Sequence, residues 1–340
     1  MEKDRVVDQN ITDRAKQAIA REFGCSAAEL EVVGVSGGYS RNRRSLVRVG
    51  NKWIFAKEVD LSLLPEDGTE ELGWLKKDHE MTRYLDSRNV SVAPEWSKLV
   101  ADGHVLLLPS YRSEDGWTWQ LPSEPAEQAK YVDAVVRATN VLANVELDDA
   151  TIEQLSAQPV FGDELAFDEG FDLVLANDAI RLQVAAKYKS LLDGQPAAHM
   201  APLLTEMLDL LDDRDTLRAL SVVGRQLAGQ PSDRFGHCDV RSDNIAYNTL
   251  TGEAKFVDWN WASLAPVGFG PTEFLLDMAR NGVDVSPWLD ELNPNLLAAT
   301  VGFYMRRCIK DPLMPGSTLR DMQAESGAVA YHLYRKIANG

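Results

Sequence analysis

The sequence of 340 residues predicts an α+β protein with two lobes, a small strand-rich N-lobe and a larger, mainly helical C-lobe. The chain is too long for one compact core, which favours two lobes. Runs with the two-residue period of strands cluster before residue 109, whereas runs with the helical period follow it. We therefore predict an N-lobe at 1–108, a hinge at 109–116 and a C-lobe at 117–340.

The N-lobe elements follow from the hydrophobic period and the turn residues. Residues 11–23 place their apolar side chains on one helical face. Thr12 or Asp13 caps this helix and Gly24 ends it, because these residue types favour those positions. A second amphipathic helix is expected over 70–86. The expected strands cover 29–35, 45–49, 52–59, 96–99 and 104–108.

The C-lobe pattern is mostly helical. The expected helices cover 125–146, 176–193, 201–228, 272–281, 294–309 and 317–337. Residues 235–262 depart from this pattern, because the strand-like runs FGHCDV, NIAYN and AKFVDW alternate there with polar turns. A strand-rich patch that carries several Asp and Asn residues within a helical lobe indicates more than scaffolding.

The amino-acid composition limits the classes of binding partner and the cellular location that we expect. Lys and Arg number 35 and Asp and Glu number 52, so the formal net charge is −17. Such a chain repels nucleic acid and anionic membranes, and we expect neither as a partner. The charge suits a cationic small substrate, but an acidic surface that serves only solubility is the favoured interpretation. Three widely spaced cysteines, a charged N-terminus without an apolar core and short apolar runs predict a cytoplasmic protein.

Three polar residues near 235–262 supply oxygen ligands. Asp239 and Asp258 offer carboxylate oxygens and Asn244 offers an amide oxygen, the donors that Mg²⁺ prefers. Taken singly, each is more often a turn residue at the end of a strand. Taken as an ordered set together with Lys57, they favour a functional site.

Charged residues elsewhere in the chain would complete the candidate site that Asp239, Asn244 and Asp258 begin. Arg241 follows Asp239 by two residues, where it either neutralises a transferring phosphoryl group or pairs with an acidic neighbour. Lys57 ends the third strand, where its ammonium group can reach a phosphate. Glu80 is the expected ion-pair partner of Lys57, with Glu70 and Glu71 as alternatives.

The turn SGGYSRNRR at 36–44 opens with Gly37 and Gly38. A double glycine lets the backbone approach phosphates closely, although a glycine pair by itself is more often a plain hairpin turn. A glycine turn, a strand lysine, a helix carboxylate, an Asp with a following Asn and a second Asp together have the form of a kinase site.

These motifs resemble the protein-kinase-like superfamily, and within it the aminoglycoside phosphotransferase and choline kinase branch. HCDVRSDN looks like the catalytic loop, which reads HRDLKPEN in protein kinases and HGDxxxxN in aminoglycoside phosphotransferases. VDWNW resembles the metal-binding segment, VSGGYSRN the nucleotide loop and FAKEV the lysine strand. Cys238 departs from the glycine or arginine that usually follows the histidine. The resemblance covers roughly residues 30–280 in the same order.

The resemblance implies a role for each matching residue. Asp239 would accept or orient the proton of a substrate hydroxyl, and Arg241 would touch the γ-phosphate. Asn244 and Asp258 would hold Mg²⁺. Lys57 would bind the α- and β-phosphates of ATP, with Glu80 as its partner. The expected nucleotide contacts are Gly37, Gly38 and Ser40 in the glycine turn, and backbone groups around Leu108 and Ser110 near the hinge, where adenine would lie.

The function implied is ATP-dependent phosphorylation of a hydroxyl group on a small molecule. An aminoglycoside, an amino sugar, a choline-like alcohol or a related metabolite would be the acceptor, and the role would be antibiotic resistance or housekeeping metabolism. A nucleotide-binding protein without catalysis is the alternative. A protein kinase is less favoured, because the sequence has no Ala-Pro-Glu segment after VDWNW.

Overall fold

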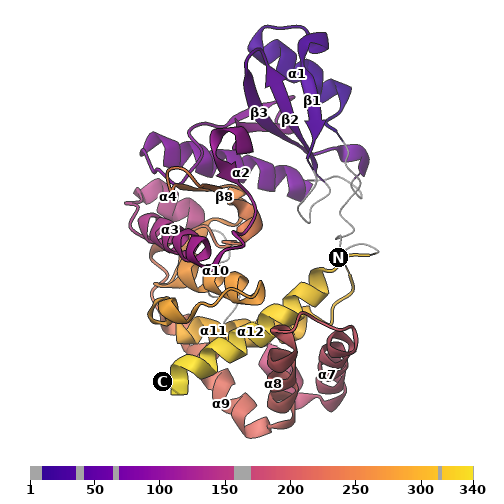
Figure 1. Cartoon of the computed structure of the whole chain (residues 1–340), viewed down its shortest axis with the longest axis vertical. Coiled ribbons are helices and arrows are strands. Elements are labelled where there is room, and N and C mark those ends of the chain that lie inside the picture. Colours follow the sequence, from indigo (N-terminus) through magenta and orange to yellow (C-terminus); the bar gives the residue numbers. More distant parts are fainter. Residues whose placement is uncertain (1–9, 36–41, 64–68, 157–169, 313–315, 340) are drawn as a thin grey trace. The chain divides into compact units, whose positions relative to one another are not determined.

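The computed structural model describes residues 10–35, 42–63, 69–156, 170–312 and 316–339. Residue contacts divide the chain into two units, each made of two chain segments (Figure 1). Unit 1 comprises Met1–Leu121 and Asp243–Ala262, and unit 2 comprises Pro122–Ser242 and Ser263–Gly340. The predicted lobe boundaries at 1–108, 109–116 and 117–340 stay a prediction, although Asp243–Ala262 groups by its contacts with unit 1.

Unit 1 is built on an antiparallel sheet with the strand order β1-β2-β3-β5-β4. Its strands are β1 (Glu31–Gly34), β2 (Arg43–Val49), β3 (Lys52–Glu58), β4 (Lys98–Val100) and β5 (Val105–Pro109), and its helices are α1 (Asp13–Phe23) and α2 (Thr69–Ser87). A smaller sheet pairs β6 (Trp117–Thr118), β8 (Ile245–Asn248) and β9 (Ala254–Phe256) in the order β6-β8-β9. All five strands and both helices predicted for the N-lobe are confirmed.

The caps of α1 follow the sequence prediction. The Thr12 side chain accepts a hydrogen bond from the Ala15 backbone N–H, and Gly24 ends the helix with a φ of 67°. Glycine is the residue that adopts this left-handed conformation without a steric penalty, so it stops the helix there.

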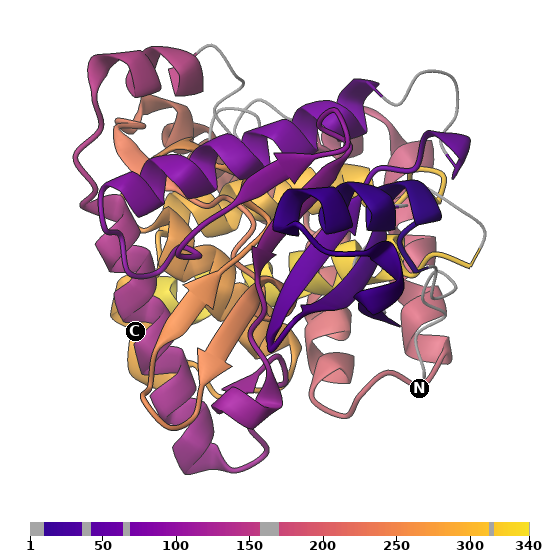
Figure 2. The ribbon, with the colours of Figure 1, turned by 90° about the horizontal axis from the view of Figure 1, so that it is seen from above.

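The two faces of the main sheet are covered by different helices (Figures 1 and 2). One apolar cluster joins α1 to side chains such as Ile54 and Ala56 of β3, and a second joins Leu75 of α2 to Leu106 and the partly buried Phe55. Because side chains alternate along a strand, residues 55 and 57 project toward α2, whereas residues 54 and 56 project toward α1. This alternation places Lys57 on the α2 face of the sheet.

Unit 2 is mainly helical. Its helices are α3 (Pro125–Ala143), α4 (Asp149–Ser156), α6 (Gly170–Ala176), α7 (Asp178–Asp193), α8 (Met200–Asp212), α9 (Arg214–Arg225), α10 (Phe269–Arg280), α11 (Pro294–Arg307) and α12 (Leu319–Asn339). A two-stranded sheet pairs β7 (Arg234–Gly236) with β10 (Ser263–Ala265).

Short 3-10 helices occur in both units, at Ala27–Glu29, Leu61–Leu63, Ser113–Asp115, Gln226–Gly229, Ser242–Asn244, Trp259–Trp261 and Ser286–Glu291.

The single long helix predicted over 201–228 is wrong in one respect. The segment forms two helices, α8 and α9, which meet at Asp213. Asp213 has an extended backbone, and its carboxylate accepts hydrogen bonds from the backbone N–H groups of Asp215 and Thr216. The residue therefore acts as the N-cap of α9 and breaks the helical run, a role that its side chain favours over a helix interior.

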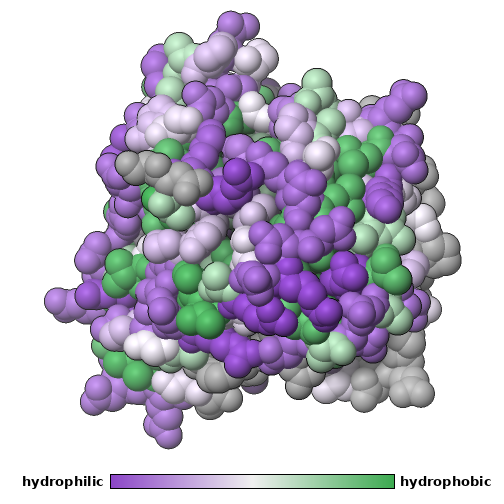
Figure 3. All heavy atoms as spheres, turned by 90° about the horizontal axis from the view of Figure 1, so that it is seen from below, coloured by the Kyte–Doolittle hydropathy of each residue, from purple (hydrophilic) through white to green (hydrophobic). Residues whose placement is uncertain are grey.

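The face of the molecule drawn in Figure 3 is mostly hydrophilic, and its hydrophobic side chains form small separate groups. Such scattered apolar residues are usual on protein surfaces. Among the described helices, none combines the length and the apolar character that crossing a bilayer requires.

Candidate functional site

Lys57 is the centre of a buried ion-pair cluster in unit 1. Its Nζ atom lies 2.6 Å from Oδ1 of Asp258, a residue 201 positions later in the chain, and 3.5 Å from Oδ2 of Asp78. The Lys57 side chain is only 7% exposed. Burial lowers the pKa of Lys57, but the two carboxylates outweigh that effect and raise it above its ordinary value, so the ammonium group keeps its charge.

The expected pairing of Lys57 with Glu80 is wrong, because Asp78 takes that place. Glu80 lies 3.7 Å from Lys76, one turn earlier on α2, and its side chain is 40% exposed. Residues two positions apart on an α-helix point roughly 200° away from one another. Since Asp78 faces the sheet, Glu80 faces away from Lys57.

Asp78 ties α2 to the segment that carries Asp258. Its Oδ1 atom accepts a hydrogen bond of 3.1 Å from the backbone N–H of Trp259, while its Oδ2 atom faces Lys57. Burial raises the pKa of Asp78 to about 6, although Lys57 opposes this shift. The carboxylate thus orients both the lysine and the residue that follows Asp258.

The hairpin of β8 and β9 brings Asn244 and Asp258 to the same end. Ile245 pairs with Phe256 in the ladder, and the backbone N–H of Val257 donates to the Asn244 carbonyl at 3.0 Å. Asp258 follows directly with a φ of 69°, a left-handed conformation that Asp tolerates better than most residues. This turn redirects the chain at Asp258, and local strain of this kind is frequent at functional sites.

The donors at this end of the hairpin fit Mg²⁺. Asp258 supplies one carboxylate and Asn244, which is 7% exposed, supplies one amide. Within the described residues, no group of three or more His, Cys, Asp or Glu side chains gathers in a metal-binding arrangement. A hard cation that keeps several waters and also binds phosphate oxygens matches such a sparse donor set, whereas a zinc site would need more protein ligands.

The structure describes only some of the residues that are predicted to contact the nucleotide. Gly37, Gly38 and Ser40 lie outside the described residues. Leu108 is a buried residue of β5, and the Ser110 hydroxyl donates to the Trp53 carbonyl at 2.9 Å. The Ser110 side chain therefore stabilises the strand end, which leaves backbone groups as the candidate nucleotide contacts there.

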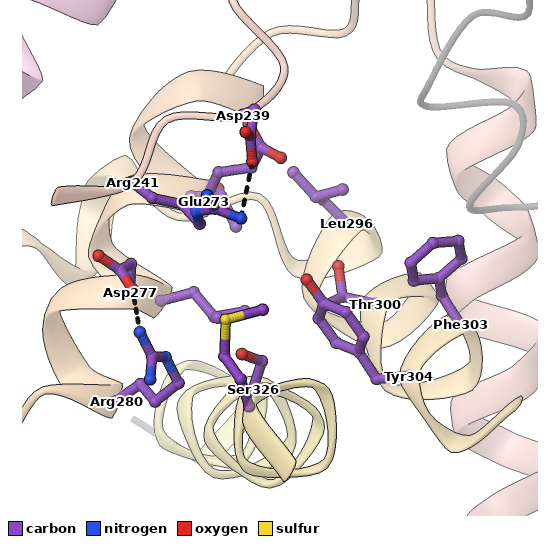
Figure 4. A pocket seen from close by; sticks show the side chains of 13 residues that line it. Asp239, Arg241, Glu273, Asp277, Arg280, Leu296, Thr300, Phe303, Tyr304 and Ser326 are labelled. Atoms are coloured by element: carbon purple, nitrogen blue, oxygen red, sulfur yellow. Dashed lines mark hydrogen bonds and ion pairs between the residues drawn. The ribbon is translucent and has the colours of Figure 1, made fainter. Parts of the chain in front are cut away.

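Asp239 and Arg241 lie in unit 2, where they line a cavity of about 80 Å³. Nη1 of Arg241 is 3.4 Å from Oδ1 of Asp239, so the acidic neighbour weighed for Arg241 is Asp239 itself. Figure 4 shows these two side chains beside Glu273, with Thr300 and Tyr304 on another wall. A carboxylate that opens into a cavity and has a cation at its side can accept a proton from a bound hydroxyl group.

Cys238 precedes Asp239 in a left-handed conformation, with a φ of 59°. Its side chain is buried in an apolar cluster with Leu227, Phe269 and Leu296. The buried thiol therefore anchors the turn from inside, at a position where the resembled families often carry glycine.

Asp277 of α10 anchors the residues that follow Asp239. Its Oδ2 atom accepts hydrogen bonds from the backbone N–H of Ser242 at 2.9 Å and from the Ser242 hydroxyl at 2.8 Å. Its Oδ1 atom is 2.6 Å from Nη2 of Arg280. Burial by itself would raise the pKa of Asp277, but Arg280 and the Ser242 hydrogen bonds lower it below the ordinary value, so the carboxylate stays ionised.

Glu273 is the second acid beside Asp239 in the cavity. Burial raises the pKa of Glu273 well above its ordinary value, and the Asp239 carboxylate raises it further. Burial also raises the pKa of Tyr304, with Glu273 adding to the shift. The cavity thus presents two carboxylates, Asp239 and Asp277, that are each paired with an arginine. Glu273 and Tyr304 line the same cavity as neutral hydrogen-bond donors.

Several of these residues were missed by sequence reasoning, although signals existed. Asp78 falls on the same helical stripe as the buried residues Leu75, Met81 and Leu85, so an acid on that stripe had to find a buried partner. Asp277 likewise interrupts an apolar helix face. The polar residues that only the structure brings to the cavity are Thr272, Glu273, Asp277, Arg280, Thr300, Tyr304 and Ser326.

Scans against protein-family models and curated proteins find no match. Among solved structures, an ethanolamine kinase from Plasmodium vivax matches with a TM-score of 0.50 and 13% identity, over 88% of this chain and 82% of that chain. A choline kinase from Streptococcus pneumoniae matches with a TM-score of 0.47 and 13% identity, over 92% and 98% of the two chains. A thermostable aminoglycoside phosphotransferase mutant in complex with ADP and hygromycin B matches with a TM-score of 0.44 and 13% identity, over 93% and 96%.

The likeness to the Plasmodium vivax ethanolamine kinase concerns the fold, and it spans most of both chains. A small unit with an antiparallel sheet and a larger helical unit agree with it. The predicted α+β, kinase-like fold class is confirmed.

Proposed function

We propose that this protein is a small-molecule kinase that transfers the γ-phosphoryl group of ATP to a hydroxyl group. The observation that carries the proposal is the ion pair of 2.6 Å between Lys57 and Asp258, which joins a strand lysine to the candidate metal ligand across 201 positions of the chain. An ion pair that serves only stability would not require an amide residue, Asn244, at the same end of the β8–β9 hairpin or a further carboxylate, Asp239, that lines a cavity. This chain carries both.

The residues of unit 1 would hold the nucleotide. Lys57 keeps its charge between Asp78 and Asp258 and offers it to the α- and β-phosphates. Asn244 and Asp258 would hold Mg²⁺, which supplies positive charge to the phosphate oxygens when bound. Catalysis of this kind depends on alignment and charge more than on covalent chemistry, so the contacts of Asp78 with Lys57 and Trp259, which orient the lysine, support it.

The residues of unit 2 would hold the acceptor. The acceptor hydroxyl oxygen forms a bond to the γ-phosphorus, the bond from that phosphorus to the bridging oxygen of ADP breaks, and Asp239 takes the hydroxyl proton. Arg241, 3.4 Å from Asp239, would compensate negative charge on the transferring group. The cavity beside Asp239 supports a small acceptor over a protein segment.

The acceptor class we propose is an amine-bearing or polyhydroxyl small molecule, namely an aminoglycoside, an amino sugar, a choline-like alcohol or a related metabolite. The net charge of −17 and the Asp239 carboxylate in the cavity support a cationic compound. An aminoglycoside acceptor would make antibiotic resistance the biological role.

The test is Mg²⁺-dependent release of ADP from ATP in the presence of aminoglycosides, amino sugars, neutral sugars, choline and amino alcohols. The decisive variant is Asp239→Asn, which keeps the shape of the side chain and removes its basicity. Asp233→Asn is the matched control, because Asp233 also lies 3.4 Å from an arginine, Arg234, but is exposed and lies outside the cavity.

Release that requires one acceptor, falls by about a hundredfold or more in Asp239→Asn and persists in Asp233→Asn supports the proposal. ATP binding by the wild type without release for any acceptor supports the non-catalytic alternative instead. Equal release by the wild type and Asp239→Asn would remove Asp239 from the proposed mechanism.

A further inference from the structure

Arg44 lies directly across the ladder from Lys57. The register of β2 and β3 pairs these two residues, and directly opposite residues of an antiparallel pair project from the same face. Both side chains therefore lie on the α2 face of the sheet. The Nη1 group of Arg44 donates to the Asn42 carbonyl at 3.1 Å, which orients the guanidinium group.

The guanidinium group of Arg44 shares the electrostatic environment of the Lys57 cluster. Burial lowers the pKa of Arg44, while Asp258 and Asp243 oppose that shift, and Arg44 in turn lowers the pKa of Lys57. Two cations thus lie close together on one partly buried face. Such an arrangement costs Coulomb energy unless anions compensate it.

The net charge of this cluster would favour a polyanion once Mg²⁺ is bound. Arg44 and Lys57 carry two positive charges, whereas Asp78, Asp243 and Asp258 carry three negative charges, so these five groups hold one net negative charge. One bound Mg²⁺ would reverse the sign of the cluster. Without Arg44, the same metal would leave the site neutral and would give it no excess charge to attract a polyphosphate.

We propose that Arg44 is a second phosphate-binding cation of this cluster, which holds the β- and γ-phosphates of the nucleotide while Lys57 binds the α- and β-phosphates. This inference rests on the proposed function, since it names a further residue of the same nucleotide site. A guanidinium group presents two parallel N–H donors that match phosphate oxygens, whereas the lysine ammonium acts as a point charge. Arg44 therefore favours nucleotides with two or three phosphates over nucleotides with one.

The test is a calorimetric titration of ATP, ADP and AMP with Mg²⁺ into the wild type, Arg44→Gln and Arg44→Lys. Arg48→Gln is the matched control. Arg48 lies on the same strand and the same face, but its guanidinium group forms an exposed ion pair of 3.0 Å with Glu31.

Arg44→Gln should weaken ATP and ADP binding by about 10- to 100-fold, the effect of one charge-assisted hydrogen bond, and AMP binding by less than about threefold. Arg44→Lys should fall between Arg44→Gln and the wild type, and Arg48→Gln should match the wild type. Circular dichroism shows whether each variant is folded. If Arg44→Gln does not fold, Arg44→Lys decides, and it should weaken ATP binding at least about fivefold more than AMP binding.

ATP binding by folded Arg44→Gln within about twofold of the wild type would overturn the inference, and so would equal weakening for ATP and AMP, which indicates general damage to the site. These outcomes leave the kinase proposal standing. A wild type that binds no nucleotide removes the proposed function and this inference with it, so the two failures are distinguishable.

Discussion

Replacing Asp277 with alanine should lower the free energy of unfolding by about 3 kcal/mol. The side chain is 5% exposed and accepts two hydrogen bonds from Ser242 in addition to its 2.6 Å contact with Arg280. Hydrogen bonds to a charged group contribute about 1.5–3 kcal/mol each, and loss of one partner of a buried ion pair costs about 3–5 kcal/mol. We take the low end, because Asp277 borders the cavity, where water can solvate Arg280, and Arg280 keeps a second carboxylate, Glu325, at 3.7 Å.

The matched control is Asp215→Ala. Asp215 pairs with Arg218 at 2.7 Å with the same three-residue helical spacing, but the two side chains are 92% and 61% exposed. An exposed pair of this kind contributes about 0–1 kcal/mol, because solvent screens it. Urea unfolding at pH 7, followed by circular dichroism, measures both variants. Equal losses for Asp277→Ala and Asp215→Ala would refute the argument that burial sets the strength of the Asp277 contacts.

The same prediction has a pH dependence. The pKa of Asp277 in the folded protein lies below its ordinary value of 3.8, so the folded state binds the proton less readily than the unfolded chain. The stabilisation by Asp277 is therefore fully present above about pH 4 and is lost as the pH falls through the lowered pKa. The difference between wild type and Asp277→Ala should shrink in that acidic range.

Three further predictions concern other sites. Asp78→Asn should lower kcat/KM by about 10- to 100-fold, because Lys57 loses a buried charged partner. Glu80→Gln should change kcat/KM by less than about twofold, and the rate of ADP release measures both variants. Gly170→Ala should destabilise the protein by about 3 kcal/mol or more in urea unfolding, since the added Cβ would lie 1.8 Å from the Gly302 carbonyl oxygen; a neutral effect would contradict that packing. The pKa of Glu273 in the folded protein is raised, so wild-type stability should fall as the pH rises above about 4.5. The melting temperature of Glu273→Gln should therefore increase relative to that of the wild type between pH 5 and 8. A difference in melting temperature that stays constant over this range would contradict the raised pKa.

Much of the local structure follows from short-range signals that the sequence carries. Thr12 and Gly24 bound α1 because a hydroxyl group caps helix N–H groups and glycine accepts a positive φ. The strands of unit 1 follow from their alternation, which also predicts that Lys57 projects from one face of the sheet. The helix break at Asp213 escaped because an acid in the middle of a helical period looks like a surface residue until its side chain is seen to cap the next helix.

By itself, the sequence determined the α+β character of the fold and the order of the polar candidates Lys57, Asp239, Asn244 and Asp258, because period, caps and motif spacing act over a few residues. The kinase-like class followed from the resemblance of these motifs to a known superfamily. Only the tertiary structure decided that Asp78 and not Glu80 pairs with Lys57, because the choice depends on which side of α2 faces the sheet. The acids that line the cavity beside Asp239 were decided in the same way. Their pairing and their pKa values depend on burial and on charges far away in the chain, which no local pattern records.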